Sequence, residues 1–251
     1  MATSYNTGIP WSASNAASAA GTIPSGVLTG DTMWLGFTIF CEAATAPAIT
    51  LTGGGATWTA PAPSAGSNPE QATTGTLYAY GYLYTAQATA SDPGATLTIT
   101  ETGSPAGTTW ISAALVTYTG AGSMQPDVIV SAAANDVLSV AAPAVNTGRA
   151  GDWYLGFQLG GTNGAPTSGP PGTQRQAVTS GAGVTAVVWD SNGTVGPAGT
   201  SIGGGTVHGG NSAPNNTFTV FTIGMAPAAA RSIAGADISL GAGCVIGIDQ
   251  Q

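Results

Sequence analysis

One stretch of the chain, residues 31–41, constrains the fold more than any other. It reads Asp31-Thr-Met-Trp-Leu-Gly-Phe-Thr-Ile-Phe-Cys41, and it recurs in shorter form as Asp152-Trp-Tyr-Leu-Gly-Phe-Gln-Leu159. In an extended chain its alternate residues form an apolar face, made in the first copy by Met33, Leu35, Phe37, Ile39 and Cys41 and in the second by Trp153, Leu155, Phe157 and Leu159. A Gly-Asp pair precedes each run, which is typical of a turn whose carboxylate binds nearby backbone. Because one such strand is not stable alone, two copies predict two sheets or sandwiches.

Other extended runs follow in a similar order in the two halves. We predict strands at residues 48–52, 76–85, 96–100, 109–118, 128–130, 137–140, 184–189 and 217–223, separated by turns rich in glycine and proline. No stretch shows the apolar spacing and caps of a helix. The predicted fold is therefore all-β, with two related antiparallel β-sandwich units, jelly-roll or immunoglobulin-like, and almost no helix. We expect an N-terminal arm at 1–26, a first unit at 27–126, a second unit at 127–228 and a C-terminal tail at 229–251.

The charge composition excludes several classes of partner. Among 251 residues there is no lysine, and three arginines face eleven acidic residues, so the net charge is −8. Three scattered cations cannot form the basic patch that nucleic acids or anionic membrane surfaces require. The start of the chain has neither a basic nor an apolar leader segment, and no apolar run reaches the ~18 residues of a membrane span. We expect no signal peptide, no membrane insertion and no nucleic-acid partner.

The titratable residues form no recognisable catalytic pattern. The only histidine, His208, lies in a glycine-rich stretch predicted to be a flexible loop, and no GxSxG elbow is present. The aspartates Asp136, Asp152 and Asp190 stand alone in the sequence. The glutamates Glu42, Glu70 and Glu101 show no spacing that selects a catalytic pair, and we expect them to be solvated surface groups. We predict no catalytic residue, no metal site and no cofactor.

The two cysteines, Cys41 and Cys244, are too few for a disulfide framework and lack CxxC spacing. Cys41 continues the apolar face that begins at Met33. We therefore predict that Cys41 is a buried free thiol in the first core.

Residues 76–85 carry a row of alternating tyrosines on one face of the predicted strand, which we call the tyrosine ladder: Tyr78, Tyr80, Tyr82 and Tyr84. Aromatic rings on a neutral sheet can stack on sugars, so the ladder is a candidate contact for a glycan or for a second subunit. The favoured alternative is packing against the other sheet, because four neighbouring tyrosines are seldom left in contact with water.

The two ends of the chain hold apolar residues with no assigned place in either unit. Lysine-guarded edge strands are also missing, so we expect a trimeric or ring-like homo-oligomer, or attachment to other proteins of a larger assembly. The alternative is that both ends fold back on their own unit. The candidate contact residues are Trp11, Ile238, Leu240, Val245, Ile246 and Ile248.

Several local motifs are similar to those of a known group of proteins. They are Gly30-Asp31 with its strand, Gly55-Ala-Thr-Trp58-Thr59, Tyr82-Leu-Tyr84-Thr-Ala86, Asp92-Pro-Gly94, residues 110–120 and Pro126-Asp127. Together they resemble β-sandwich virion proteins, minor tail or head-surface proteins, of tailed bacteriophages that infect high-GC Gram-positive hosts. The second unit lacks an equivalent of Trp58 and of the Asp-Pro-Gly turn.

The resemblance implies a virion component without catalytic residues, made in the host cytoplasm and located in the virion. The expected function is that of a non-enzymatic structural protein, a minor tail protein or a capsid decoration protein. Two alternatives stay open: a carbohydrate-binding adhesion module that contacts a host-surface glycan, and an enzyme that degrades cell-wall polysaccharide.

Overall fold

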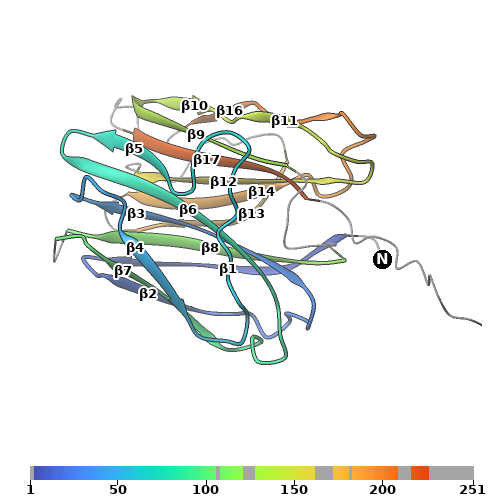
Figure 1. Ribbon diagram of the computed structural model, residues 1–251, viewed down its shortest axis with the longest axis horizontal. Helices are drawn as coiled ribbons and strands as arrows, with labels where there is room; N and C mark the ends of the chain where they lie inside the picture. Colours follow the sequence, from blue (N-terminus) through green and yellow to red (C-terminus); the bar gives the residue numbers. More distant parts are fainter. Residues whose placement is uncertain are drawn as a thin grey trace, which may run out of the picture.

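The protein is a stack of β-layers. The computed structural model describes residues 3–105, 108–120, 128–161, 172–180, 183–208 and 216–225, and every regular element in these ranges is a β-strand, which confirms the all-β prediction. Two five-stranded sheets lie face to face in the middle, and shorter strands cover the outer face of each (Figure 1). No helix in the described ranges is long and apolar enough to cross a membrane.

The first unit consists of a five-stranded sheet and a three-stranded sheet. The first inner sheet has the order β1 (Ser4–Ser14), β8 (Trp110–Thr119), β3 (Thr32–Cys41), β6 (Leu77–Gln87), β5 (Glu70–Thr74). The first outer sheet has the order β2 (Ser18–Thr22), β7 (Thr96–Thr102), β4 (Ala48–Thr52). Successive strands alternate between the two sheets, β5 excepted, and all pairs are antiparallel. This is the jelly-roll alternative, since immunoglobulin-like units keep several successive strands in one sheet.

The second unit has a matching inner sheet and a different outer layer. The second inner sheet has the order β9 (Val128–Val137), β17 (Asn216–Met225), β12 (Trp153–Gly161), β14 (Val184–Asp190), β13 (Thr173–Thr179). When the five strands of each inner sheet are numbered by their position along the chain, the two inner sheets have the same strand order. Two short ribbons cover them: β10 (Ser139–Ala141) with β16 (Thr206–His208), and β11 (Ala144–Asn146) with β15 (Ser201–Gly203). The duplication of the sequence itself stays a prediction.

Strand β3 is buried along its whole length because both faces of the first inner sheet are covered. Its predicted apolar face, from Met33 to Cys41, lies in the first core, between the first inner and outer sheets. Trp34, on the other face, lies in a central core between the two inner sheets. A central strand with two covered faces reads as a nearly continuous apolar run, as this one does.

The second copy of the motif points its apolar face toward the first unit. Leu155 and Phe157 lie in the central core, whereas Leu35 and Phe37 point away from it into the first core. Four positions separate Asp31 from Leu35, but three separate Asp152 from Leu155. Because side chains alternate along a strand, this one-residue difference moves the motif to the opposite face.

The two inner sheets approach closely at two glycines of the first inner sheet. A Cβ atom at Gly36 would collide with the Phe157 ring, and one at Gly81 would collide with Thr219. Hydroxyl groups then reach the backbone of the facing sheet: Thr38 Oγ1 donates to the Thr185 carbonyl at 3.0 Å and Ser112 Oγ to the Val184 carbonyl at 2.8 Å. The interface between the units is therefore packed and hydrogen-bonded.

The predicted N-terminal arm is part of the first unit. Strand β1 pairs with β8 from Ser4 to Ser14, and β2 pairs with β7. Trp11 is 8% exposed within the first core, and Ile23 is fully buried. The prediction of a separate arm was wrong because alanine, serine and threonine, which gave no apolar pattern, form these strands through backbone hydrogen bonds.

The segment before β5 contacts the second unit. Ser64 N and Oγ both donate to the Ile129 carbonyl at 2.8 Å, and Ser131 N donates to the Ala65 carbonyl at 2.9 Å. On the same edge, Thr73 N donates to Asn135 Oδ1 at 2.8 Å. This segment of the first unit therefore extends along β9 of the second unit.

Candidate functional site

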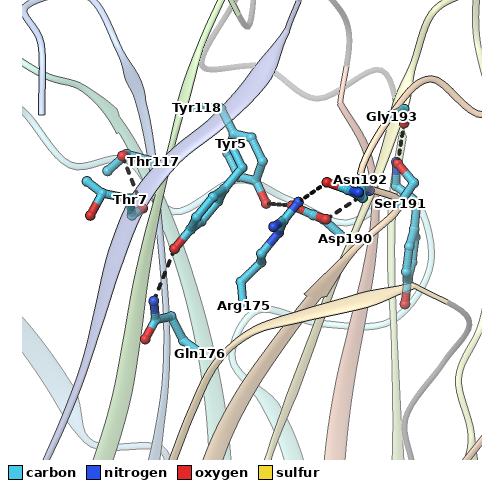
Figure 2. A network of polar contacts seen from close by, with 11 residues as sticks. Tyr5, Thr7, Thr117, Tyr118, Arg175, Gln176, Asp190, Ser191, Asn192 and Gly193 are labelled. Atoms are coloured by element: carbon cyan, nitrogen blue, oxygen red, sulfur yellow. Dashed lines mark hydrogen bonds and ion pairs between the residues drawn. The ribbon is translucent and has the colours of Figure 1, made fainter. Parts of the chain in front are cut away.

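A polar network joins the two units at one edge of the inner sheets (Figure 2). Its centre is Asp190, the fully buried last residue of β14. Asp190 Oδ2 accepts hydrogen bonds from Tyr118 Oη at 2.8 Å and from Arg175 Nε at 2.7 Å, and Asp190 Oδ1 accepts one from Asn192 N at 2.9 Å. Tyr118 comes from β8 of the first unit, and the other groups belong to the second.

A second set of contacts surrounds the Arg175 side chain. Its guanidinium carbon lies 4.4 Å from the centre of the Tyr5 ring, and its Nη2 donates to Asn192 Oδ1 at 2.7 Å. Tyr5 also accepts a hydrogen bond from Gln176 Nε2 at 3.1 Å and meets the Tyr118 ring edge-on at 5.8 Å. Strands β1 and β8 are thereby tied to β13 and β14, which are neighbours in Figure 1.

The electrostatics of this network keep each of its groups in one protonation state and do not favour proton transfer. Burial raises the pKa of Tyr118 well above its ordinary value, and the adjacent negative charge of Asp190 raises it further. Tyr118 is therefore a neutral donor and Asp190 a charged acceptor, neutralised by Arg175. Charge-assisted bonds of this kind are geometrically specific and strong. The contacts among Tyr118, Asp190 and Arg175, which we call the lock, therefore connect the two units, and these three side chains bind one another.

The tyrosine ladder lies against the outer sheet of its own unit. Tyr80 and Tyr82 are 1% and 4% exposed, and their hydroxyls donate to the carbonyls of Ala43 at 2.8 Å and Pro47 at 2.7 Å. Tyr78 and Tyr84 are half-buried. The Phe37 ring stacks on Tyr82 at 5.0 Å and on Tyr84 at 5.8 Å. The inner two rings thus offer no free face to a sugar in this structure.

The three glutamates have different surroundings. Glu42 is exposed and Glu70 is half-buried, but Glu101 is only 4% exposed, so its predicted surface position was wrong. Glu101 accepts hydrogen bonds from Thr109 Oγ1 at 3.2 Å and Ser104 N at 3.3 Å. Glu70 accepts bonds from Ser67 N at 2.9 Å and from Ser131 Oγ across the unit boundary. Glu70 and Glu101 thus both anchor local backbone.

The other singled-out residues are placed as follows. Cys41 is a free, fully buried thiol in the first core, as predicted, and burial raises its pKa. Asp152 binds the turn before its strand, accepting from Gly148 N at 3.1 Å. His208 ends strand β16, where a loop was predicted. Cys244 and the tail contacts Ile238, Leu240, Val245, Ile246 and Ile248 lie outside the described residues.

A pocket of about 320 Å³ opens in the second unit next to the network. Its lining consists of one aromatic residue, three hydroxyl residues, two aliphatic residues and two glycines: Tyr154, Ser191, Thr200, Ser201, Val195, Ile202, Gly172 and Gly203. Tyr154 is 3% exposed, and its hydroxyl has no hydrogen-bond partner. In the described ranges no group of three His, Cys, Asp or Glu residues is arranged to hold a metal ion.

Sequence reasoning missed both the network and the pocket. Asp190 was taken as an isolated acid, and residues 173–179, which hold Arg175, gave no strand signal because they are mostly polar. One usable signal was present: Arg175 is one of only three cations in the chain, and a rare cation is expected to pair with an acid. The comparisons with known proteins add no identity, because no family, curated protein or solved structure matches the chain.

Proposed function

We propose that this protein is a non-enzymatic structural component of a bacteriophage particle, either a minor tail protein or a capsid-surface decoration protein. The observation that carries the proposal is the jelly-roll strand order of the first unit, repeated in the second inner sheet. Jelly rolls are common in viral capsid proteins and lectins. A fold alone does not establish a function. The local resemblance to tail and head-surface proteins gives the proposal its direction.

The way in which the units are joined supports a passive, load-transmitting role. The central core, the Tyr118–Asp190–Arg175 lock and the strip between residues 64–73 and β9 connect the units over one broad face. Large apolar interfaces suppress the relative motion expected of loosely linked domains. A single rigid block suits a protein that transmits position from one neighbour to another.

The chain composition fits assembly in a particle. With no lysine and 6% charged residues, the chain has few charges to repel identical copies. We therefore retain the proposal that it forms a trimer or ring, or binds other virion proteins, through its C-terminal segment. Light scattering should show an assembly for the full chain and a smaller species for a chain that ends at Ala230. A monomeric full chain, or an assembly unaffected by the truncation, would contradict this contact.

The proposed function itself is tested on particles. Mass spectrometry of purified virions, from the phage whose genome encodes the chain, should detect its peptides together with those of the major capsid protein as a positive control. Antibody labelling in electron microscopy should then place it on the tail or on the head. Detection in the lysate but not in intact virions would refute the proposal.

A further inference from the structure

The first outer sheet has an open edge at strand β4. The order of this sheet is β2, β7, β4, so β4 pairs with β7 on one side only. In the described part of the chain, no hydrogen bond joins the other side of β4 to a neighbouring segment. An edge strand of this kind presents a row of free N–H and C=O groups with which another extended segment can pair.

The other sheet edges in the described ranges are less suited to such pairing. Strands β1 and β13 each contain a register shift, which bends an edge away from a flat partner. Residues 64–65 already bond to β9, and Thr73 N of β5 donates to Asn135. The ribbon strands β10, β11, β15 and β16 have three residues each. Strand β2 is regular, but only Ala19 and Gly21 alternate on its core side.

Strand β4 also leaves apolar side chains partly uncovered. Ile49 and Leu51 pack against the first core but are only half-buried, whereas Leu97 and Ile99 of the neighbouring β7 are fully buried. The residues that alternate with them in β4 are exposed. The first core is therefore incompletely covered beside β4. A further strand with aliphatic residues at alternate positions would cover it.

Two members of the tyrosine ladder hold the segment that leads into β4. The Tyr80 hydroxyl donates to the Ala43 carbonyl at 2.8 Å, and the Tyr82 hydroxyl donates to the Pro47 carbonyl at 2.7 Å, directly before β4 begins. The start of this edge is thereby fixed from below by buried side chains. A binding surface that is already ordered loses little conformational freedom when a partner is added.

The residue pattern of this sheet recurs in the C-terminal segment. Two branched aliphatic residues flank a hydroxyl residue in Ile49-Thr-Leu51, in Leu97-Thr-Ile99 and again in Ile238-Ser-Leu240. In β4 and β7 the aliphatic residues face the first core and the threonine lies on the opposite face. Residues 226–236 separate the third copy of the pattern from the end of β17. An extended chain of that length spans about 35–40 Å, which is enough to reach a neighbouring molecule.

We propose that Ile238-Ser-Leu240 of one copy pairs antiparallel with β4 of a neighbouring copy and places Ser239 beside Thr50. The two aliphatic residues of the segment then cover the exposed sides of Ile49 and Leu51. This inference rests on the proposed assembly through the C-terminal segment, and it names the surface that receives that segment. Each copy gives one segment and receives another, and such a head-to-tail contact closes into a ring or trimer.

The test is disulfide cross-linking of the purified full chain that carries Thr50→Cys and Ser239→Cys, with Cys244→Ser to remove the other thiol of the segment. Residues directly opposite each other on antiparallel strands have Cβ atoms about 4.5–5.5 Å apart, close to the span of a disulfide. Oxidation should therefore give covalent dimers and larger species on a non-reducing gel. The matched control replaces Thr50→Cys by Ala20→Cys, which is equally exposed in the middle of β2 at the other edge of the same sheet. The control should stay monomeric on the gel.

A second measurement uses the aliphatic residues of the segment. The double variant Ile238→Asn and Leu240→Asn should have the same mass in light scattering as the chain that ends at Ala230, whereas Ile233→Asn should assemble as the natural protein does. The proposal is overturned if the Thr50→Cys protein cross-links no more than its control, if the disulfide forms within one chain, or if the double variant assembles normally.

These outcomes are separate from a failure of the proposed function. If truncation at Ala230 dissolves the assembly but the position-50 and position-239 cysteines do not cross-link between chains, the edge assignment is refuted and the C-terminal contact stands. Absence of the protein from purified virions would refute the virion role, whatever the gel shows.

Discussion

Removal of the Asp190 carboxylate should strongly destabilise the whole protein. The Asp190→Ala variant takes away the acceptor of three donors: Tyr118 Oη, Arg175 Nε and Asn192 N. Tyr118 is fully buried, and the Arg175 side chain is 15% exposed. Neither group can be fully rehydrated unless the units separate.

The expected magnitude follows from that burial. Breaking a buried ion pair by removing one partner costs about 3–5 kcal/mol, because the remaining charge is left uncompensated. Tyr118→Phe removes one hydrogen bond to a charged group and should cost about 1.5–3 kcal/mol. Because both changes act on the same bond, the double variant should lose less than the sum of the two single losses.

The assay is urea unfolding of the full chain, followed by tryptophan fluorescence and by far-UV circular dichroism. We expect one transition, the same for both probes, because the two units share the central core. Glu42→Ala is the matched control, since this carboxylate is exposed and its loss should change stability by no more than about 0.5 kcal/mol. An Asp190→Ala loss no larger than this control, or strict additivity with Tyr118→Phe, would refute the reasoning.

Four further outcomes are expected. Gly36→Val should lower the urea midpoint by overpacking the ring of Phe157, at a cost of about 1–3 kcal/mol, and an unchanged midpoint would contradict the close approach of the sheets. Burial opposes ionisation of Asp92, but hydrogen bonds from Thr89, Gly55 and Ala56 outweigh it and lower the pKa of Asp92. The ionised Asp92 carboxylate should therefore stabilise the folded protein fully above about pH 4, and this stabilisation should be lost as the pH falls further. An Asp92→Asn variant with the same acid unfolding profile as the natural protein would argue against it. Burial raises the pKa of Tyr80 to about 12, so absorbance titration should show a phenolate that forms at higher pH than that of a free tyrosine. The contribution of Tyr80 to folding stability should be complete below about pH 10 and be lost as the pH rises toward 12. Normal titration of all seven tyrosines would contradict the packed ladder. The Cys41 thiol should react with a thiol reagent only after denaturation, and a native Cys41–Cys244 bridge in a peptide map would show otherwise.

The sequence was sufficient for the strands whose side chains are apolar and β-branched or aromatic. Strands β3, β6, β8, β12, β14 and β17 lie within a few residues of their predicted ranges. They are the inner strands of the two inner sheets, and burial on one or both faces leaves a strong pattern.

The same reasoning located β4 and β7 of the first outer sheet but failed for strands of mostly small and polar residues. Strands β1, β2, β5 and β13 consist largely of Ser, Thr, Ala and Gln, and all four lie at the edge of their sheet. Backbone pairing holds such strands, and backbone hydrogen bonds leave little trace in side-chain composition. Residues 1–26 were consequently assigned to an arm.

The candidate site depended on contacts that no local pattern encodes. Tyr5 and Gln176 are 171 positions apart, and Tyr118 and Asp190 are 72 apart. The direction in which the apolar face of the repeated strand points was equally hard to predict, because it depends on a one-residue difference in the spacing between Asp152 and Leu155. Such pairings are set by how the two inner sheets dock, which only the tertiary structure fixes.

The strand order determines which surfaces of the chain are exposed while it is being synthesised. Strand β17 occupies the interior of the second inner sheet, yet it is the last described strand to leave the ribosome. Until it arrives, the second sheet is divided, and Trp34, Leu83 and Val116 of the first unit have no complete surface to pack on. At about 5–20 residues per second, the interval between β8 and β17 lasts on the order of 5–20 s. During that time each nascent chain exposes an apolar sheet face, so slow translation or crowded polysomes should favour aggregation of incomplete chains over that of finished protein.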